Sequence, residues 1–209
     1  VCSFLFISHI YAGKLIDMSA AGYFLSLPET TLSDKKFPVL ICLPGRGVSA
    51  KQDINVWSFP AEKGGFIVID LDVNYNLIHS HQDVIALYRR IINIVTSLSA
   101  NYPIDAKKLY IAGTSAGGMM SISLALMFSN KFRAIGVVSG GRLRFAAQDN
   151  LRKANGCRFY MVHGAKDKSI PIEEVYYTKE QLVGNGAIVE FKMIPKGAHT
   201  LPSYIYKEV

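Results

Sequence analysis

The sequence predicts an α/β fold in which a mostly parallel sheet is covered by helices on both faces. Short apolar runs of strand length alternate with segments whose apolar residues recur every three or four positions. The apolar runs are continuous rather than alternating, which is typical of strands covered on both faces. The repeated order strand, helix, strand favours parallel pairing through crossover helices.

The first half of the chain carries three such runs and one long helical pattern. A strand is expected at 23–27, where Pro28 ends the run. The run 38–43 (PVLICL) is followed by the turn residues 44–47, and the run 66–71 (FIVIDL) is equally apolar. A helix is expected from about Gln82 to Ser99, because six apolar residues recur there at helical spacing: Val84, Leu87, Tyr88, Ile91, Val95 and Leu98.

The second half continues the alternation. Its apolar runs predict strands at 109–112, 135–139, 159–162 and 188–194. Helices are expected at 115–129, which is rich in small and apolar residues, and at 172–183. Gly184 and Gly186 end the second of these helices. A further helix is expected to begin within 204–209.

Length and composition indicate one globular domain over residues 1–209. Half of the 209 residues are hydrophobic and 19% are charged, which is far from the composition of disordered chains. No repeat, low-complexity tract or Pro/Gly-rich linker divides the chain. Three cysteines are too few, and odd in number, for a disulfide scaffold, so Cys42 and Cys157 are expected to be buried free thiols.

Residues 1–12 (VCSFLFISHIYA) allow two interpretations. Their apolar character resembles the end of a signal peptide, but a positively charged leading region is missing and the first residue is Val. The alternative is an ordinary first strand. A signal remnant would indicate a secreted or periplasmic protein, and otherwise a cytoplasmic one is expected, so the sequence leaves the compartment open.

The formal charge of +7 does not indicate a nucleic-acid-binding protein. The basic residues are scattered pairs rather than a cluster with interleaved aromatic residues, which favours a solvated surface. The pairs are Arg89-Arg90, Arg142/Arg144, Arg152-Lys153 and Lys166/Lys168. An anionic substrate is a remaining alternative. No stretch approaches the roughly 18 apolar residues of a membrane helix, so no membrane span is expected.

The strongest local motif is Gly113-Thr114-Ser115-Ala116-Gly117, between an expected strand and an expected helix. G-x-S-x-G in that context is typical of a nucleophile elbow, a turn so sharp that side chains beside it must be nearly absent. The turn lifts Ser115 Oγ clear of the sheet, at a helix N-terminus where developing negative charge is favoured. A glycine-rich turn with an incidental serine is the alternative.

A serine hydroxyl needs a base to remove its proton, and five histidines are available. His199 follows the last expected strand in a small-residue loop (KGAHT), which brings it to the carboxyl edge of the sheet with Ser115. His163 ends an apolar strand and is expected to be structural. His79 and His81 form a His-x-His pair, but no Cys or carboxylate cluster completes a metal site, so no metal is expected. His199 is therefore the expected base.

An orienting carboxylate is expected on another loop that follows a strand. Asp167 lies four residues beyond the strand that ends at His163, although aspartate is also a common turn residue. Glu173 and Glu174 are rivals, but they open a helix, where acidic residues are ordinary. The resulting chain order is serine, aspartate, histidine.

The reaction also needs two donors for its oxyanion. The backbone N–H of Ala116, which follows the serine, is one candidate. The second is expected from the loop after an early strand, and Arg46 N–H fits best because the flanking Gly45 and Gly47 let the backbone turn inward.

With these motifs in place, the sequence resembles the α/β-hydrolases. More narrowly, it is similar to the lidless branch that contains small carboxylesterases, feruloyl-esterase-like proteins, and poly(3-hydroxybutyrate)-depolymerase or phospholipase/carboxylesterase relatives. The matching stretches follow the family's order: 43–47 (LPGRG), 104–118 (IDAKKLYIAGTSAGG), 162–171 (VHGAKDKSIP) and 197–199 (GAH). The resemblance implies an α/β-hydrolase fold without a large cap domain.

By that resemblance, Ser115 is the nucleophile, His199 the general base and Asp167 its partner. Arg46 and Ala116 form the oxyanion hole, and Gly113 and Gly117 shape the elbow. The implied activity is hydrolysis of carboxylic esters through an acyl-enzyme, on small-molecule or polymer-borne substrates and without a cofactor. A peptidase, a thioesterase and a non-catalytic binding protein of the same fold are the alternatives. The sequence indicates no oligomeric state.

Two departures from the family pattern stand out. Pro44 takes the place of the histidine that usually precedes the oxyanion glycine, which matters little if the backbone N–H is the donor. The family also has a full helix after its histidine, whereas ten residues follow His199, so a truncated C-terminal helix is expected. The segment between Ser139 and Cys157 is too short for a large cap, so an open site is expected.

Overall fold

The computed structural model describes residues 14–28, 35–207 and 209. An eight-stranded sheet runs through it in the order β1-β2-β4-β3-β5-β6-β7-β8. Strands β3 to β8 are parallel, and β1 and β2 pair antiparallel at one edge. The strand bounds are β1 Leu15–Met18, β2 Tyr23–Ser26, β3 Phe37–Leu43, β4 Ile67–Leu71, β5 Ile104–Thr114, β6 Phe132–Val138, β7 Arg158–Gly164 and β8 Ile188–Ile194.

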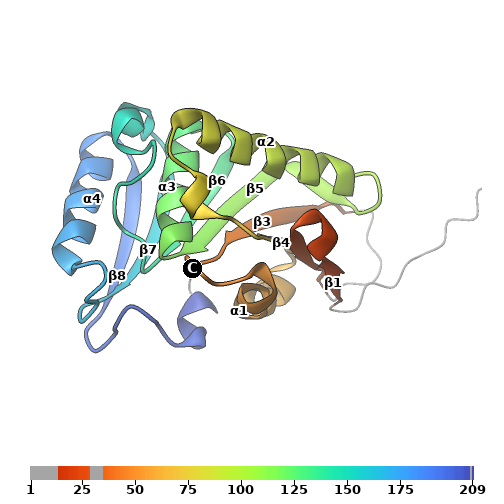
Figure 1. Cartoon of the computed structure of the whole chain (residues 1–209), viewed down its shortest axis with the longest axis horizontal. Coiled ribbons are helices and arrows are strands. Elements are labelled where there is room, and N and C mark those ends of the chain that lie inside the picture. The colour runs from red at the N-terminus through yellow and green to blue at the C-terminus, as the bar shows by residue number, and fades with distance from the viewer. Residues whose placement is uncertain (1–13, 29–34, 208) are drawn as a thin grey trace, which may run out of the picture.

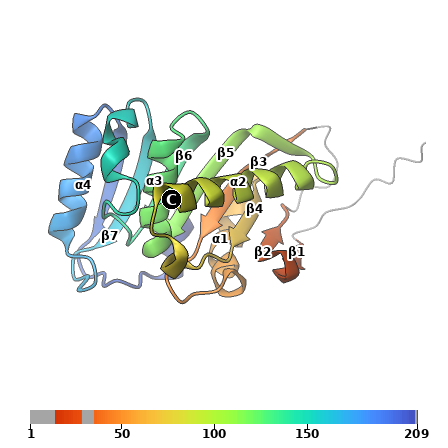
Figure 2. The ribbon, with the colours of Figure 1, turned by 45° about the horizontal axis from the view of Figure 1, so that its top comes forward.

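Helices cover both faces of this sheet, as the sequence predicts (Figures 1 and 2). On one face α2, α3 and α4 pack over the larger hydrophobic core, and on the other face α1 and the turn η4 pack over a smaller one. The helices are α1 Ala50–Gly64, α2 His81–Leu98, α3 Ala116–Met127 and α4 Ile172–Gly184, with short 3-10 turns η1 Ser19–Ala21, η2 Tyr75–Leu77, η3 Gln148–Lys153 and η4 Ser203–Lys207.

The alternation of side chains along each strand divides the two cores. On β4, Ile67, Ile69 and Leu71 enter the larger core, whereas Val68 enters the smaller one. Strand side chains point to alternate faces, so this five-residue run has to be apolar on both sides. Asp70 is the exception, and it is fully buried.

Most element boundaries agree with the expectations to within a few residues, and four features differ. Helix α1 and the edge strand β1 were not predicted. Strand β5 is eleven residues long, because Ile104 already pairs with Phe37 across a shift in register. The expected helix at 204–209 is the 3-10 turn η4. The expectation for residues 1–12 lies outside the described residues.

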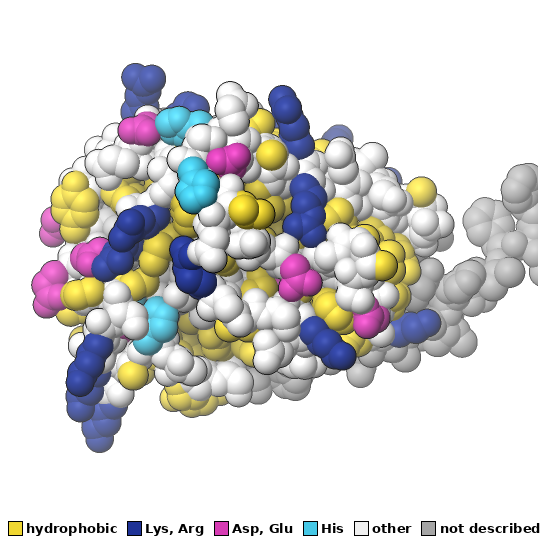
Figure 3. All heavy atoms as spheres, viewed as in Figure 1, with side chains coloured by type: hydrophobic (Ala, Val, Ile, Leu, Met, Phe, Trp, Pro, Cys, Tyr) yellow, Lys and Arg dark blue, Asp and Glu magenta, His cyan; other side chains and the backbone are white. Residues whose placement is uncertain are grey.

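Cys42 and Cys157 are buried free thiols, which confirms that prediction. Between β6 and β7 the chain forms only the short turn η3 and loops, without a large cap. Lys and Arg are interspersed with Asp and Glu on the face shown in Figure 3, rather than gathered into one basic stripe. Within the described part of the chain, every helix is too short or too polar to cross a membrane.

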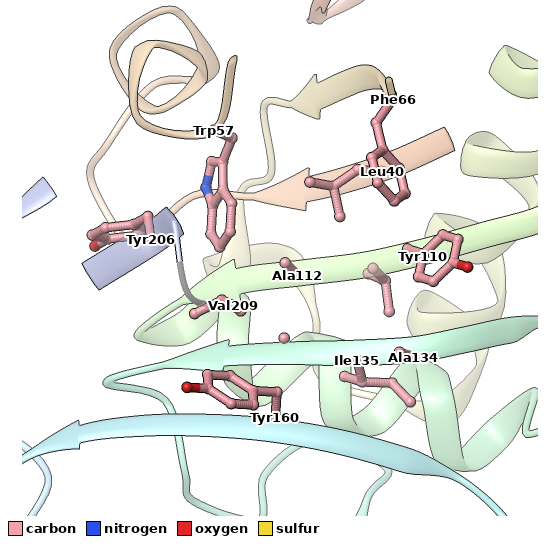
Figure 4. Close-up of a pocket in the computed structure, with 12 residues that line it drawn as sticks. Leu40, Trp57, Phe66, Tyr110, Ala112, Ala134, Ile135, Tyr160, Tyr206 and Val209 are labelled. Carbon is pink, nitrogen blue, oxygen red and sulfur yellow. The ribbon is translucent and has the colours of Figure 1, made fainter. Parts of the chain in front are cut away.

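A hollow of about 220 Å³ lies on the α1 face of the sheet. Figure 4 shows Trp57 of α1 and Tyr206 of η4 at one end of it and Phe66 and Tyr110 at the other. The lining is mainly aromatic and aliphatic, and Ser115 is not part of it. This hollow is therefore separate from the residues at the carboxyl edge of the sheet.

Helix α2 begins with a capping box. Ser80 Oγ accepts the backbone N–H of Asp83, and the Asp83 carboxylate accepts the backbone N–H of Ser80. Both bonds satisfy donors that the helix itself leaves free.

We expect Ser80→Ala to lower the free energy of unfolding by about 1 kcal/mol, because this cap is lost. Ser97→Ala is the matched control, since Ser97 is exposed inside the same helix and alanine is the better helix former there. Urea unfolding of both variants checks the difference. Equal stabilities for the two variants would contradict the role assigned to the cap.

Candidate active site

Ser115 lies in the sharp turn between β5 and α3. Its backbone has φ = 53° and ψ = −116°, a strained conformation for a residue with a side chain. The turn is held because Ser115 N–H donates to Val138 O at 2.9 Å and Met119 N–H donates to Ser115 O at 3.0 Å. The serine side chain is half-buried at the carboxyl edge of the sheet.

Two glycines make this turn possible. A β-carbon on Gly117 would lie 1.9 Å from Leu43 O, and one on Gly113 would lie 2.4 Å from the carbonyl carbon of Gly117. A β-carbon closer than 3.0 Å to a backbone atom is essentially never found in folded proteins. Helix α3 therefore passes against β3 and β5 only because these side chains are absent, as expected for a nucleophile elbow.

The loops after β7 and β8 are joined in a similar way. Ala165 N–H donates to Ile194 O at 2.9 Å and Lys166 N–H to Gly197 O at 2.8 Å. Gly164 and Gly197 lie so close that a β-carbon on Gly164 would be 2.4 Å from Gly197 O. This contact brings the loop that carries Asp167 against the loop that carries His199.

The structure brings the three predicted side chains into one hydrogen-bonded chain. His199 Nδ1 lies 2.7 Å from Asp167 Oδ2, and His199 Nε2 lies 2.9 Å from Ser115 Oγ. A proton on Nδ1, donated to the carboxylate, leaves Nε2 free to accept the serine O–H. The Asp167 side chain is fully buried, whereas 32% of the His199 side chain is exposed.

Asp167 remains ionised in this setting. Burial alone would raise the pKa of its carboxyl, but hydrogen bonds from Ile170 N–H, from His199 and from Ser169 N–H outweigh the burial and lower it. The two backbone bonds to Oδ1 are 2.9 and 2.7 Å long. An ionised, fixed carboxylate is what an imidazolium beside it requires.

His163 lies behind this carboxylate. Its Nε2 is 2.9 Å from Ile170 O and 3.2 Å from Asp167 Oδ2, and the ring is 1% exposed. Burial lowers the pKa of His163, so the ring is neutral and donates Nε2–H to the carbonyl. The side chain thus braces the 164–171 loop, in agreement with the structural role expected for it.

The alternative candidates that the sequence offered do not take part in this hydrogen-bonded chain. Glu174 forms an ion pair with Arg142, away from His199. His81 Nε2 lies 3.0 Å from Asp149 Oδ2 in an exposed pair. Among the residues that the structure describes, no group of three or more His, Cys, Asp and Glu side chains is arranged to hold a metal ion.

The loop after β3 lies against the serine. The β-carbon position of Gly45 is 3.6 Å from Ser115 Cβ, so the backbone around Arg46 borders the site. Within the described residues, no backbone carbonyl accepts the Arg46 N–H. The Ala116 N–H is at the first turn of α3, where no acceptor exists within the helix.

Comparison with known proteins identifies the family. Residues 68–208 match the phospholipase/carboxylesterase family of α/β-hydrolases, which is more than half of the chain. The chain belongs to this family. The matched region begins in β4 and includes Ser115, Asp167 and His199.

Two curated relatives of this carboxylesterase-family chain are fungal. Feruloyl esterase D of Neurospora crassa is 32% identical over 93 residues, which cover 44% of this chain and 31% of the relative. Probable feruloyl esterase C of Aspergillus terreus is 28% identical over 165 residues, which cover 75% and 58%. The chain thus spans between about a third and three fifths of the length of these relatives.

Solved structures support the same fold. The Staphylococcus aureus protein FphF, described as a fluorophosphonate-binding serine hydrolase, superposes with a TM-score of 0.70 at 15% identity. The superposition covers 89% of this chain and 88% of that protein. At this identity the likeness establishes the α/β-hydrolase fold alone.

The sequence did not indicate how the loop after β3 is held. Tyr75 Oη–H donates to Pro44 O at 2.7 Å, and Asp72 Oδ1 accepts the Ala50 N–H at 2.7 Å. Tyr75 itself is 4% exposed. These partners are 22 to 31 residues apart in the chain, so no local pattern reveals them.

We expect Gly117→Ala to lower the stability of this carboxylesterase-family protein by about 3 kcal/mol or more, because the new methyl group meets backbone atoms of β3. Gly184→Ala is the control, since no atom lies within 4 Å of its β-carbon position. Thermal unfolding of both variants measures the effect. A Gly117→Ala protein as stable as the control would refute the close approach at the elbow.

Proposed function

We propose that this protein is a serine hydrolase of carboxylic esters in which Ser115 is the nucleophile, His199 the general base and Asp167 the residue that orients the base. The observation that carries the proposal is the continuous contact from Asp167 through His199 to Ser115, at 2.7 and 2.9 Å. Membership of a carboxylesterase family agrees with it.

In the first step Ser115 Oγ attacks the ester carbonyl while its proton moves to His199 Nε2. The imidazolium that forms is stabilised by the ionised Asp167 and then gives its proton to the departing alcohol, leaving an acyl group on Ser115. A water molecule, deprotonated by His199, attacks the acyl-enzyme in the same way. Ser115 regains its proton and the carboxylic acid leaves.

The negative charge of each tetrahedral intermediate falls on the former carbonyl oxygen. The N–H of Ala116 at the start of α3 and the N–H of Arg46 in the loop beside Ser115 are the proposed donors. A preorganised donor of this kind contributes roughly 10²–10³ in kcat. Because both are backbone groups, Pro44 in place of the family's histidine leaves the donor set intact.

Esters of hydroxycinnamic acids are the first substrates to test, since the fungal relatives are named feruloyl esterases. The short β6–β7 connection, without a large cap, is compatible with an ester attached to a larger molecule. Methyl ferulate, p-nitrophenyl acetate, and the corresponding thioester and anilide separate esterase from thioesterase and peptidase activity.

We expect Ser115→Ala to lower kcat for p-nitrophenyl acetate by about 10⁴-fold or more, because the nucleophile is lost. Asp167→Asn should lower kcat by about 10⁴-fold with an unchanged fold, because the amide favours the wrong tautomer of His199. Glu174→Gln is the matched control for the carboxylate and should retain activity. Steady-state kinetics check all three, and unchanged hydrolysis by Ser115→Ala would exclude the proposed nucleophile.

A further inference from the structure

The loop 44–49 is held at its start by two side chains of the segment that follows β4. Tyr75 Oη–H donates to Pro44 O at 2.7 Å. The amide oxygen of Asn76 accepts a hydrogen bond from the Arg46 guanidinium. The position of this part of the loop beside Ser115 therefore depends on residues about thirty positions further along the chain.

The first turn of α1, which follows the loop directly, is held by Asp72 of that segment and by Asp70 of β4. Asp72 Oδ1 accepts the Ala50 N–H at 2.7 Å and so satisfies a free donor at the start of α1. One turn into α1, the buried Asp53 carboxyl lies beside the buried Asp70 carboxyl of β4, close enough for the two groups to share a proton. Tyr75 and Asn76 thus contact the loop itself. Asp72 and Asp70 contact the first turn of α1, which follows the loop directly.

The contact between Asp53 and Asp70 requires a proton. Asp70 is 0% exposed and Asp53 is 6% exposed. Within the described residues no N–H or O–H group donates to either oxygen of Asp70, whereas Asp53 Oδ2 accepts the Trp57 Nε1–H at 3.0 Å. Two buried carboxylates in contact repel each other when both are ionised, so the pair is stable only with one shared proton.

The surroundings keep that proton on the pair. Burial raises the pKa of Asp53 to about 6, and burial together with the nearby Asp53 charge raises the pKa of Asp70 well above its usual range. The titratable groups that face the pair are Cys42 of β3, Asp72, Tyr75 and Tyr206 of η4. In the described part of the chain, no ion pair links Asp53 or Asp70 to a cation. At neutral pH the pair therefore keeps one proton, which lies between the two carboxyl groups.

We propose that Asp53 and Asp70 are positioning residues: the proton they share fixes the first turn of α1 to β4 and, with Asp72 and Tyr75, holds the loop 44–49 against Ser115. This inference rests on the proposed function, in which Arg46 N–H of that loop is an oxyanion donor. The donor acts on charge that develops only in the transition state, so its displacement lowers kcat and leaves KM nearly unchanged.

The pair also makes stability depend on pH. An aspartate whose pKa is raised on folding stabilises the folded state fully below about pH 4, its unfolded value, and this contribution is lost as the pH rises through the folded value. The wild-type protein should therefore lose stability between about pH 4 and 6 and at higher pH. Asp70→Asn keeps a donor to Asp53 but carries no charge, so the loss should be smaller.

The first experiment compares wild type, Asp70→Ala and Asp70→Asn with p-nitrophenyl acetate at pH 7. Asp70→Ala should lower kcat by about 10-fold or more, with KM within about twofold, and Asp70→Asn should restore kcat to within about threefold of wild type. Asp149→Asn, an exposed aspartate paired with His81, is the control and should match wild type. A folded Asp70→Ala protein with wild-type kcat would overturn the proposal.

Tyr75→Phe removes one hydroxyl and gives an independent test if Asp70→Ala does not fold. It should lower kcat about 10-fold with little change in KM, because Pro44 O loses its donor. A wild-type kcat in this variant would contradict the role of the segment.

Thermal unfolding between pH 4.5 and 8 tests the shared proton without reference to catalysis. The melting temperature of wild type should fall by about 3 °C or more relative to Asp70→Asn across this range. Equal slopes would refute the shared proton. If Ser115→Ala hydrolyses esters as wild type does, the proposed function fails, and the unfolding measurement still decides whether the pair holds α1.

Discussion

The whole site depends on one steric constraint, the crossing of α3 over β3 and β5 without intervening side chains. At Gly117 a single methyl group would collide with the backbone at Leu43, and at Gly113 it would collide with the start of the helix. With hydrogen in both places, the chain turns from strand to helix within one residue. That residue is Ser115, whose positive φ is maintained by hydrogen bonds to Val138 and Met119.

The parallel sheet then brings the other groups to the same edge. Loops that follow parallel strands end on one side of a sheet, so the loops after β3, β7 and β8 converge on the turn after β5. The glycine contact between Gly164 and Gly197 joins two of them and sets the distance from Asp167 to His199. The loop after β3 is held by hydrogen bonds to Tyr75 and Asn76 of the segment after β4. The positions of Asp167 and His199 relative to Ser115 thus depend on backbone packing between two loops. The position of the loop after β3 depends on polar side-chain contacts.

Much of this could be predicted from the sequence, and the exceptions have physical causes. A continuous apolar run predicted β4 Ile67–Leu71, because all five of its residues are buried. The edge strand β8 Ile188–Ile194 also coincides with its predicted range, although its residues are partly buried or exposed. Helix α1 was missed because its sequence contains Pro60 and has only a weak apolar stripe, so its stability comes from packing of Ile54 and Trp57 on the sheet. Strand β1 has four residues and exists through its pairing with β2.

The site residues also divide into those with a recognisable local sequence pattern and those that depend on tertiary contacts. Ser115, Asp167 and His199 could be chosen from the sequence because each follows a recognisable strand, and the structure brings all three together. Asp70 was hidden inside an apolar run, and its partner Asp53 belongs to the helix that was not predicted. Side chains that act across the fold leave no local pattern, so they become visible only with the tertiary structure.

Labelling with a fluorophosphonate probe, followed by intact-protein and peptide mass spectrometry, tests directly whether His199 activates Ser115. We expect a single adduct on Ser115 in the wild-type protein, none in Ser115→Ala, and much slower labelling in His199→Ala. The absence of an adduct in folded wild-type protein, or an adduct on a different serine, would contradict it.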